Sequence, residues 1–219
     1  MPSEFVFAFM DCEFGGLDPD KHDITEVGLI ITDYRLVEQS ERQWRVKARP
    51  DRISAEAAKI FGYDEELWAK APPVRQVLEE IVAMMPEGKV VVPAGQNVRM
   101  DVMFLELAFR KCEIPYPFDY HVIDLATLFY TWTLVTDAPA RALSLRQAAT
   151  SAGLLGSGGV AHRALEDARL TLETFRHYVG RLAPAAIPPT GDGETPGTRE
   201  RDSAANTKKK DTDEPGNST

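Results

Sequence analysis

Apolar residues divide the chain into a strand-rich first part and a helix-rich remainder. Three runs with strand composition come first, at residues 5–10, 24–32 and 37–48. Because Asp33-Tyr34-Arg35 makes a short turn between the second run and the third, we expect those two strands to pair antiparallel. Two short apolar runs, at 90–92 and 122–124, each precede a helical pattern and predict two further buried strands.

Helical signals lie between and after these strands. Residues suited to the N-cap or the first turn of a helix are Ser54, Asp64, Pro72-Pro73 and Ser144. A long final helix is indicated by apolar positions three and four residues apart, at Leu165, Ala168, Leu172, Phe175, Val179 and Leu182. This order of elements supports an α/β domain.

Acidic residues stand near the ends of these elements, and each alone has an ordinary explanation. The segment FMDCEFGGLDP carries Asp11 and Glu13 after the first apolar run, where they could be solvated acids at a strand end. The segment GQNVRMDVMFL carries Asp101, which could merely support the amino end of a helix through its dipole. Because side chains alternate between the faces of a strand, Asp11 and Glu13 share one face, and we expect Cys12 to pack on the other.

A third segment, HRALEDA, carries His162 and Asp167. Five positions correspond to about 140° around a regular helix, so the two side chains cannot share a face if both lie inside it. We therefore expect His162 at or before the first turn, approached by the flexible LLGSGGVA stretch, and Asp167 fixed on the second turn. A histidine near a helix start can also be a surface or capping residue.

Together these residues are the groups that phosphodiester hydrolysis needs. A phosphodiester is an anion that repels hydroxide, so divalent cations are required to neutralise it and to activate a water. Magnesium prefers oxygen ligands, which makes carboxylates rather than thiolates the expected ligands. The sequence therefore predicts a metal-dependent nuclease.

The order, spacing and context of the three segments resemble those of the DEDD exonucleases, a group that includes the DNA polymerase III proofreading subunit, RNase T and oligoribonuclease. The resemblance runs from about residue 5 to 182. It includes Gly16-Leu17-Asp18-Pro19, Glu26-Val27-Gly28 and Asn97. The histidine at position 162 marks the DEDDh branch.

This resemblance implies an α/β fold of the RNase H-like type, with a mixed five-stranded sheet flanked by helices. It implies that two Mg²⁺ ions, which Mn²⁺ can replace, are held by Asp11, Glu13, Asp101 and Asp167. His162 would be the base that takes a proton from the attacking water. The implied activity is 3′→5′ removal of nucleoside 5′-monophosphates from the 3′ ends of single-stranded or short DNA or RNA.

By the same resemblance, the candidates for substrate binding are Leu17, Phe61, Phe14 and Asn97. Apolar side chains can stack on terminal bases without sequence preference, although Leu17, Phe61 and Phe14 could equally be core residues. Two positions depart from the family pattern. Phe14-Gly15 stands where relatives usually have a hydroxyl residue, and Gln96 stands where many have a histidine.

Composition agrees with one enzyme domain, which we expect to comprise residues 1–183. The 43% hydrophobic and 9% aromatic contents are ordinary for a globular protein. Two cysteines, Cys12 and Cys112, give no disulfide framework and fit a reducing cytosol. The sequence shows neither a signal peptide nor a membrane-spanning stretch, so we expect a soluble cytoplasmic protein that does not bind membranes.

Residues 184–219 differ from the rest in composition. They are rich in Pro, Gly, Ser, Thr and charged residues, which predicts a disordered polar tail. From Pro188 onward there are seven acids and five bases, a net charge of −2, which leaves −7 of the total −9 on the rest of the chain. Lys208-Lys209-Lys210 could contact nucleic acid or a protein partner, but a solvated tail is favoured.

The net negative charge disfavours tight binding to long duplexes, because phosphate neutralisation drives that affinity. An enzyme that acts at a free end grips only a few nucleotides. Arg45, Lys47 and Arg49 alternate in the third predicted strand and would share one face, as a nucleic-acid contact or as a charged edge. The alternatives left open are an RNA-trimming enzyme, a metal-dependent phosphomonoesterase and a non-catalytic nucleic-acid or partner-binding protein; a homodimer is also compatible.

Overall fold

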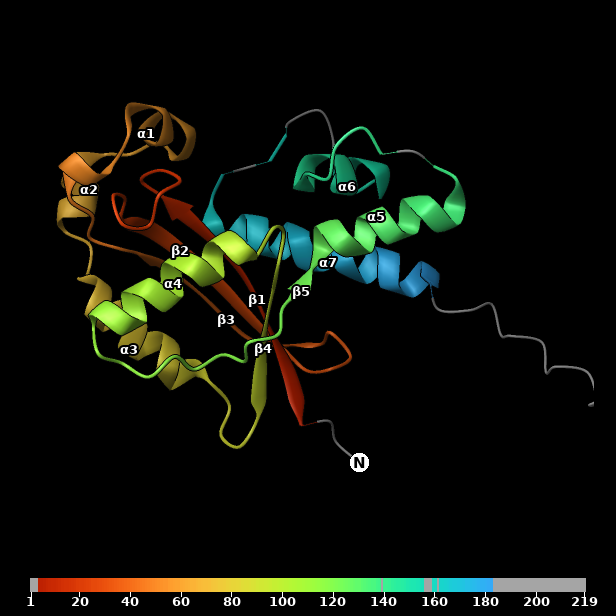
Figure 1. Cartoon of the computed structure of the whole chain (residues 1–219), viewed down its shortest axis with the longest axis horizontal. Coiled ribbons are helices and arrows are strands. Elements are labelled where there is room, and N and C mark those ends of the chain that lie inside the picture. Colours follow the sequence, from red (N-terminus) through yellow and green to blue (C-terminus); the bar gives the residue numbers. More distant parts are fainter. Residues whose placement is uncertain (1–3, 139, 156–158, 161, 183–219) are drawn as a thin grey trace, which may run out of the picture. The chain divides into compact units, whose positions relative to one another are not determined.

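The computed structural model describes residues 4–138, 140–155, 159–160 and 162–182 (Figure 1). The strands are β1 (Phe5–Phe14), β2 (Ile24–Thr32), β3 (Glu38–Arg45), β4 (Val90–Gly95) and β5 (Ile123–Asp124). The helices are η1 (Pro50–Arg52), α1 (Ala55–Phe61), α2 (Glu65–Ala69), α3 (Val74–Met84), α4 (Arg99–Lys111), α5 (Leu125–Thr136), α6 (Leu145–Ser151) and α7 (Ala164–Leu182).

The five strands form one mixed sheet in the order β3-β2-β1-β4-β5. β1 pairs antiparallel with β2, and β2 pairs antiparallel with β3, as the short connection between the second and third runs predicted. β4 pairs parallel with β1 and with β5. The predicted RNase H-like sheet flanked by helices is therefore confirmed.

β1 is longer than its apolar run and carries Asp11 and Glu13 inside the strand. Its pairing with β2 continues past the run, with Asp11 opposite Gly28 and Glu13 opposite Glu26. A strand can extend through acidic residues when a neighbouring strand satisfies its backbone. The alternation of faces is as predicted, because Cys12 is 6% exposed and belongs to the core under α3 and α4.

β3 is shorter than the predicted 37–48 because its register with β2 ends where Arg45 meets Glu26. Beyond it, the backbone N–H of Lys47 donates to Pro72 instead of to a strand. Lys47 and Arg49 therefore lie outside the strand, and the prediction that they share a strand face with Arg45 is wrong. The Arg45 guanidinium lies over the Trp68 ring, 4.7 Å from its centroid.

Helices cover both faces of the sheet (Figure 1). α3 and α4 pack on the even-numbered side chains of β1, whereas Phe9 packs against Ala168 and Leu172 of α7 on the other face. The predicted caps are confirmed: the side chains of Ser54, Asp64 and Ser144 each accept a hydrogen bond from a backbone N–H in the first turn of their helix.

The second half of α7 packs differently from the prediction. Val179 and Leu182 are 39% and 37% exposed, whereas Tyr178 is buried and donates from its hydroxyl to the Ala148 carbonyl at 2.8 Å. The reason is that α5 and α6, rather than the sheet, cover this half of the helix. The buried stripe is therefore set by neighbours that helical periodicity does not reveal.

The predicted tail, 184–219, lies outside the described residues, and the prediction about it stays a prediction. Within the described ranges, no helix combines the length and apolar character that crossing a membrane requires.

Candidate active site

The sheet opens between β1 and β4 at the carboxyl end of β1, and α4 begins there. The last β1–β4 pair in the register is Phe9 with Ala94. Beyond it, the backbone N–H of Cys12 donates to Asp101 Oδ1 at 2.8 Å. Asp101 lies in the first turn of α4 and is 4% exposed. It is therefore more than a solvated residue at a helix amino end, because its carboxylate is tied to β1 between Asp11 and Glu13.

The amino end of α7 rests directly on β2 at Gly28. A Cβ atom added to Gly28 would lie 2.3 Å from the backbone carbonyl carbon of Ala164, so only glycine permits this approach. Gly28 is also the partner of Asp11 in the β1–β2 register. The close approach thus brings the first turn of α7, with the buried carboxylate of Asp167, to the acidic end of β1.

His162 precedes α7, as predicted from its spacing to Asp167. The helix begins at Ala164, so Asp167 belongs to its first turn rather than to the second. His162 is exposed and has a left-handed backbone with φ of 53°. A non-glycine residue in this conformation is uncommon and indicates a constrained connection into the helix.

Side-chain donor atoms of Glu13, His162 and Asp167 all lie within 4.8 Å of one another. Asp167 lies in α7, His162 lies two residues before that helix, and Glu13 lies in β1. The structure therefore brings together the first and third sequence segments, which are separated by about 150 positions. The hydrogen bond from Cys12 to Asp101 adds the second segment.

Burial and mutual repulsion favour protonated carboxyl groups here when no cation is bound. Burial, followed by the charges of Asp101 and Asp167, raises the pKa of Asp11 well above its usual value. Burial raises the pKa of Asp101 to about 8, although a hydrogen bond from the β1 backbone opposes the rise. The pKa of Glu13 rises to about 7 through burial and the neighbouring charges of Asp167 and Glu26.

This donor set fits a divalent metal ion. Carboxylates held this close repel one another, and a hard cation with oxygen preference would relieve that repulsion. The exposed imidazole at the edge of the cluster can serve as a nitrogen ligand or as a proton acceptor. Glu13, His162 and Asp167 are the residues whose donor atoms are close enough together to hold one ion. Asp11 and Asp101 lie outside that group, although their charges act on each other and on Glu13.

The loop after Glu13 is held rigidly beside the cluster. A Cβ atom on Gly15 would lie 2.2 Å from the Arg52 carbonyl oxygen, and the Gly15 carbonyl accepts from the Ser54 N–H at 2.7 Å. Glycine at position 15 is thus a requirement of packing. The same loop presents Leu17, which is 82% exposed and free to meet a ligand.

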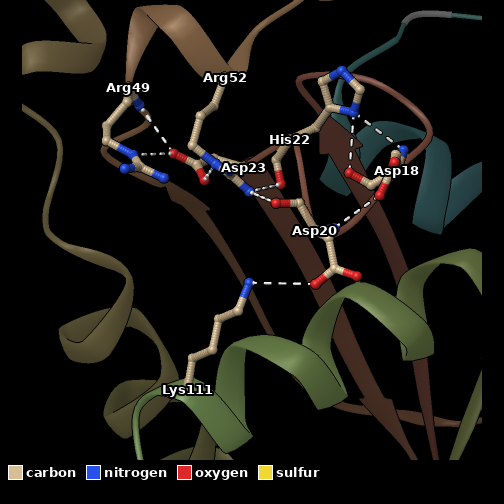
Figure 2. A network of polar contacts seen from close by, with 7 residues as sticks. All are labelled: Asp18, Asp20, His22, Asp23, Arg49, Arg52 and Lys111. Atoms are coloured by element: carbon tan, nitrogen blue, oxygen red, sulfur yellow. Dashed lines mark hydrogen bonds and ion pairs between the residues drawn. The ribbon is translucent and has the colours of Figure 1, made fainter.

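Ion pairs fix the far end of this loop (Figure 2). Arg52 Nε lies 2.5 Å from Asp23 Oδ1, and Arg49 Nε lies 3.4 Å from Asp23 Oδ2. Lys111 Nζ, from the end of α4, reaches Asp20 at 3.9 Å. The surrounding residues also line a cavity of about 540 Å³, which none of the five predicted catalytic residues lines.

The other predicted substrate residues lie in different environments. Phe14 stacks on Phe104 with ring centroids 4.0 Å apart. Phe61 is 5% exposed and packs against Tyr63 and Trp68, so it has little surface to offer a base in this conformation. Asn97 is exposed between β4 and α4 and has φ of 54°, a conformation that asparagine tolerates.

The structure also shows three residues whose contacts sequence reasoning did not assign. Glu26 is 1% exposed beside Glu13, and Arg163 reaches it from the position after His162. Gln96 donates from its side-chain amide to the Leu143 carbonyl at 2.6 Å and so ties the end of β4 to the α5–α6 connection. Two sequence features could have indicated the Glu26–Arg163 contact: the position of Glu26 in the Glu26-Val27-Gly28 segment and the arginine directly after His162.

The sequence of this chain is similar to those of known exonucleases and DNA polymerases. A family model described as exonuclease, RNase T, matches residues 8–175. A curated relative, the PolC-type DNA polymerase III of Thermotoga petrophila, is 29% identical over 189 residues, which cover 83% of this chain. The corresponding Thermotoga maritima protein is 27% identical over the same length. The match spans only 12% of each of these relatives.

Solved structures share the fold. Exonuclease I of E. coli in its zinc-bound complex with single-stranded DNA aligns with a TM-score of 0.68 and 18% identity, covering 81% of this chain and 40% of that one. A 3′-exonuclease solved for its recognition of a histone mRNA stem-loop aligns with a TM-score of 0.63 and 14% identity, covering 81% and 63%.

Proposed function

The chain belongs to the RNase T family of exonucleases, and we propose that it is a 3′→5′ exonuclease that removes nucleoside 5′-monophosphates from single-stranded or short nucleic acid. The observation that carries this proposal is the convergence of three sequence segments. Asp101 binds the backbone of β1 between Asp11 and Glu13, and the donor atoms of Glu13, His162 and Asp167 lie within 4.8 Å of one another.

Exonucleases of this family depend on divalent metal ions, which supply phosphate neutralisation and an acidified water when bound. In this chain Asp11, Glu13, Asp101 and Asp167 would hold them, and we propose Mg²⁺ as the physiological ion with Mn²⁺ as a substitute. His162 would accept the proton of the attacking water, because its exposed ring lies beside the carboxylates without being enclosed by them.

Leu17, Phe14 and Asn97 would contact the terminal nucleotide. Leu17 has the exposed apolar surface that stacking on a base requires, and its loop is fixed by the Gly15 and Asp23 contacts. A rigid loop orients a bound end at low entropic cost. Phe61 is buried against Tyr63 and Trp68, so we assign it no direct stacking on the terminal base.

Polarity and substrate are supported by the similar structures. One was solved with single-stranded DNA and another for recognition of an RNA 3′ end. Choice between DNA and RNA depends on contacts to the 2′-hydroxyl. An RNA-specific trimming activity is the second candidate, and the same assay decides between the two.

The test uses purified full-length protein with Mg²⁺ on matched DNA and RNA oligonucleotides, single-stranded and duplex, labelled at either end. A 3′→5′ exonuclease releases the 3′ label at once as a mononucleotide and shortens the 5′-labelled strand stepwise. The released nucleotide should carry its phosphate at the 5′ position. Release from the 5′ end, internal cleavage or hydrolysis of terminal phosphates alone would contradict the proposal, and the Asp101→Asn variant controls for contaminating nucleases.

A further inference from the structure

Glu26 is a buried acid that the proposed chemistry does not use. Its side chain is 1% exposed, and it lies opposite Glu13 in the β1–β2 register. A carboxylate in this position is costly, because burial disfavours its charge and because it repels the carboxylates of Asp11 and Glu13. Its presence beside the proposed metal ligands therefore calls for a compensating contact.

That contact comes from the residue next to the proposed base. Arg163 Nε lies 3.6 Å from Glu26 Oε1, and the side-chain amide of Gln43 donates to the same oxygen. Burial raises the pKa of Glu26, and the charge of Arg163 opposes this rise most, followed by the charge of Arg45 and a hydrogen bond from the Ala164 backbone N–H at the start of α7. Arg163 itself is 46% exposed, and it reaches inward from the surface to meet the carboxylate.

Arg163 lies between two residues whose backbones are restricted. His162 before it has φ of 53°, and Ala164 after it rests on Gly28 with no room for a Cβ atom between them. The Glu26–Arg163 pair thus spans the point where the chain enters α7. This entry sets where His162 stands and how Asp167 meets Glu13.

We propose that Glu26 is a positioning residue of the nuclease site, which fixes the amino end of α7 through Arg163 and so holds His162 and Asp167 against Glu13. The assignment rests on the proposed exonuclease function for its kinetic consequence. Two arginines within α7 form analogous pairs, Arg169 with Glu41 and Arg176 with Glu38, but these pairs tie the helix to β3. Of these three pairs, the Glu26–Arg163 pair is the one next to His162 in the sequence.

The experiment compares wild type with Glu26→Gln, Arg163→Met and the double variant. Loss of a contact that orients residues around a metal typically costs about 10- to 100-fold in activity. We expect Glu26→Gln and Arg163→Met each to lower kcat by about that factor with KM within twofold. The double variant should be no slower than the slower single variant, because both act through one contact. A threefold or smaller change in kcat for Glu26→Gln, or additive losses, would overturn the proposal.

Glu41→Gln is the matched control, since it removes an ion pair of the same type from the same helix. Glu41→Gln should leave kcat unchanged. If the ion pairs of this helix were purely structural, Glu41→Gln and Glu26→Gln would both lose activity in proportion to the decrease in their melting temperatures. If Arg163 instead contacted substrate phosphate, Arg163→Met would raise KM while Glu26→Gln would not, and that result would also overturn the assignment.

Amide hydrogen exchange in the metal-free protein provides a readout that needs no activity. Glu26→Gln and Arg163→Met should each speed exchange in the first turn of α7 by about tenfold, while Glu41→Gln leaves that turn unchanged. Arg163 is on the surface, so its variant remains informative if Glu26→Gln fails to fold. If the wild-type protein degraded no nucleic acid, the proposed function would be refuted. If amide exchange in the first turn of α7 were unchanged in the variants, the positioning role of Glu26 would be refuted.

Discussion

The backbone N–H of Cys12 and the Oδ1 atom of Asp101 are 2.8 Å apart, although 89 residues separate them in the sequence. This hydrogen bond joins the middle of the Asp11-Cys12-Glu13 segment to the first turn of α4, at the point where β1 leaves β4. This hydrogen bond thereby fixes the position of the Asp101 carboxylate beside β1.

Asp101→Asn separates this hydrogen bond from the proposed role of Asp101 as a metal ligand. The asparagine side-chain oxygen can still accept from Cys12, so the fold should be retained, but the variant lacks the charge that a metal ligand supplies. We expect nuclease activity to fall by at least about 10³-fold while the melting temperature of the metal-free protein does not decrease. The measurement is the initial rate at saturating Mg²⁺ alongside a thermal unfolding scan.

Asp119→Asn is the control for this substitution. Asp119 is an acid that accepts from His121 on the surface, away from the carboxylate cluster. Its variant should retain wild-type rates. An Asp101→Asn protein that remains active with the same Mg²⁺ dependence would exclude Asp101 as a ligand.

Gly28→Ala tests whether the approach of α7 to β2 sets the site. The added methyl group would meet the Ala164 backbone at 2.3 Å, and backbone atoms cannot move aside cheaply. The amino end of α7 must shift, and a displacement of about 1 Å can cost about 10²-fold in rate. We expect a loss of about 1–3 kcal/mol in unfolding free energy together with that loss of turnover.

Gly180→Ala supplies the comparison within α7. Gly180 lies inside α7, whereas Gly28 lies in β2 beneath it. No atom lies within 4 Å of a Cβ atom built on Gly180. Alanine there should leave activity unchanged and raise stability by about 0.5–1 kcal/mol, because glycine is a poor helix former. If Gly28→Ala were as benign as Gly180→Ala, the close approach would not control the geometry of the site.

The raised pKa values predict that the metal-free protein loses stability as the pH rises. Asp101 and Glu13 have folded pKa values of about 8 and about 7, above their usual values of 3.8 and 4.5. Between about pH 4 and pH 8 the folded protein therefore binds more protons than the unfolded chain. As the pH rises, these protons leave the folded protein, and the stability that the protonated carboxyl groups contribute decreases. This contribution is fully lost above about pH 8.

Thermal unfolding in EDTA and in Mg²⁺ from pH 5 to pH 9 measures this effect. The melting temperature in EDTA should fall by several degrees over this range, since about 1 kcal/mol corresponds to about 2–4 °C in a domain of this size. Bound Mg²⁺ should reduce the fall, because it favours the ionised carboxylates. In EDTA, the melting temperature of Asp101→Asn should depend less on pH than that of wild type. Equal pH dependence of the two proteins would show that the charge of Asp101 does not destabilise the metal-free fold.

Local patterns were sufficient to find the residues of the candidate site but not the contacts that arrange them. Strand alternation placed Asp11 and Glu13 on one face, and helical spacing placed His162 before α7. The extension of β1 to Phe14 depends on pairing with β2, which the composition of β1 alone does not indicate. The burial of Phe61 likewise depends on Tyr63 and Trp68, which form an aromatic cluster around it.

The tight approach at Gly28 and the Glu26–Arg163 pair were equally hidden from sequence reasoning. Each joins residues more than 130 positions apart, and neither periodicity nor capping rules report on such contacts. A glycine in a strand indicates only that some backbone comes close, without saying which one. The three-dimensional arrangement supplies the missing partner in both cases.

His162→Ala tests the residue proposed as the base. If His162 accepts the proton of the attacking water, the variant should keep metal affinity and KM while kcat falls by roughly 10²- to 10⁴-fold, the usual contribution of general base catalysis. This corresponds to about 2.7–5.5 kcal/mol of activation free energy. Titration of the metal-free protein with Mn²⁺ measures affinity, and single-turnover rates with Mg²⁺ measure the chemical step.

The position of His162 makes this experiment decisive between two roles. Because its nitrogen lies within 4.8 Å of donor oxygens on Glu13 and Asp167, the ring could bind a cation directly instead of accepting a proton. A ligand role would weaken Mn²⁺ binding in His162→Ala, whereas a base would leave it unchanged and would lose the rate alone. His121→Ala, at an exposed histidine paired with Asp119, should change neither quantity. Turnover of His162→Ala within about threefold of wild type, with chemistry as the slow step, would exclude both roles and leave His162 as a surface residue before the helix.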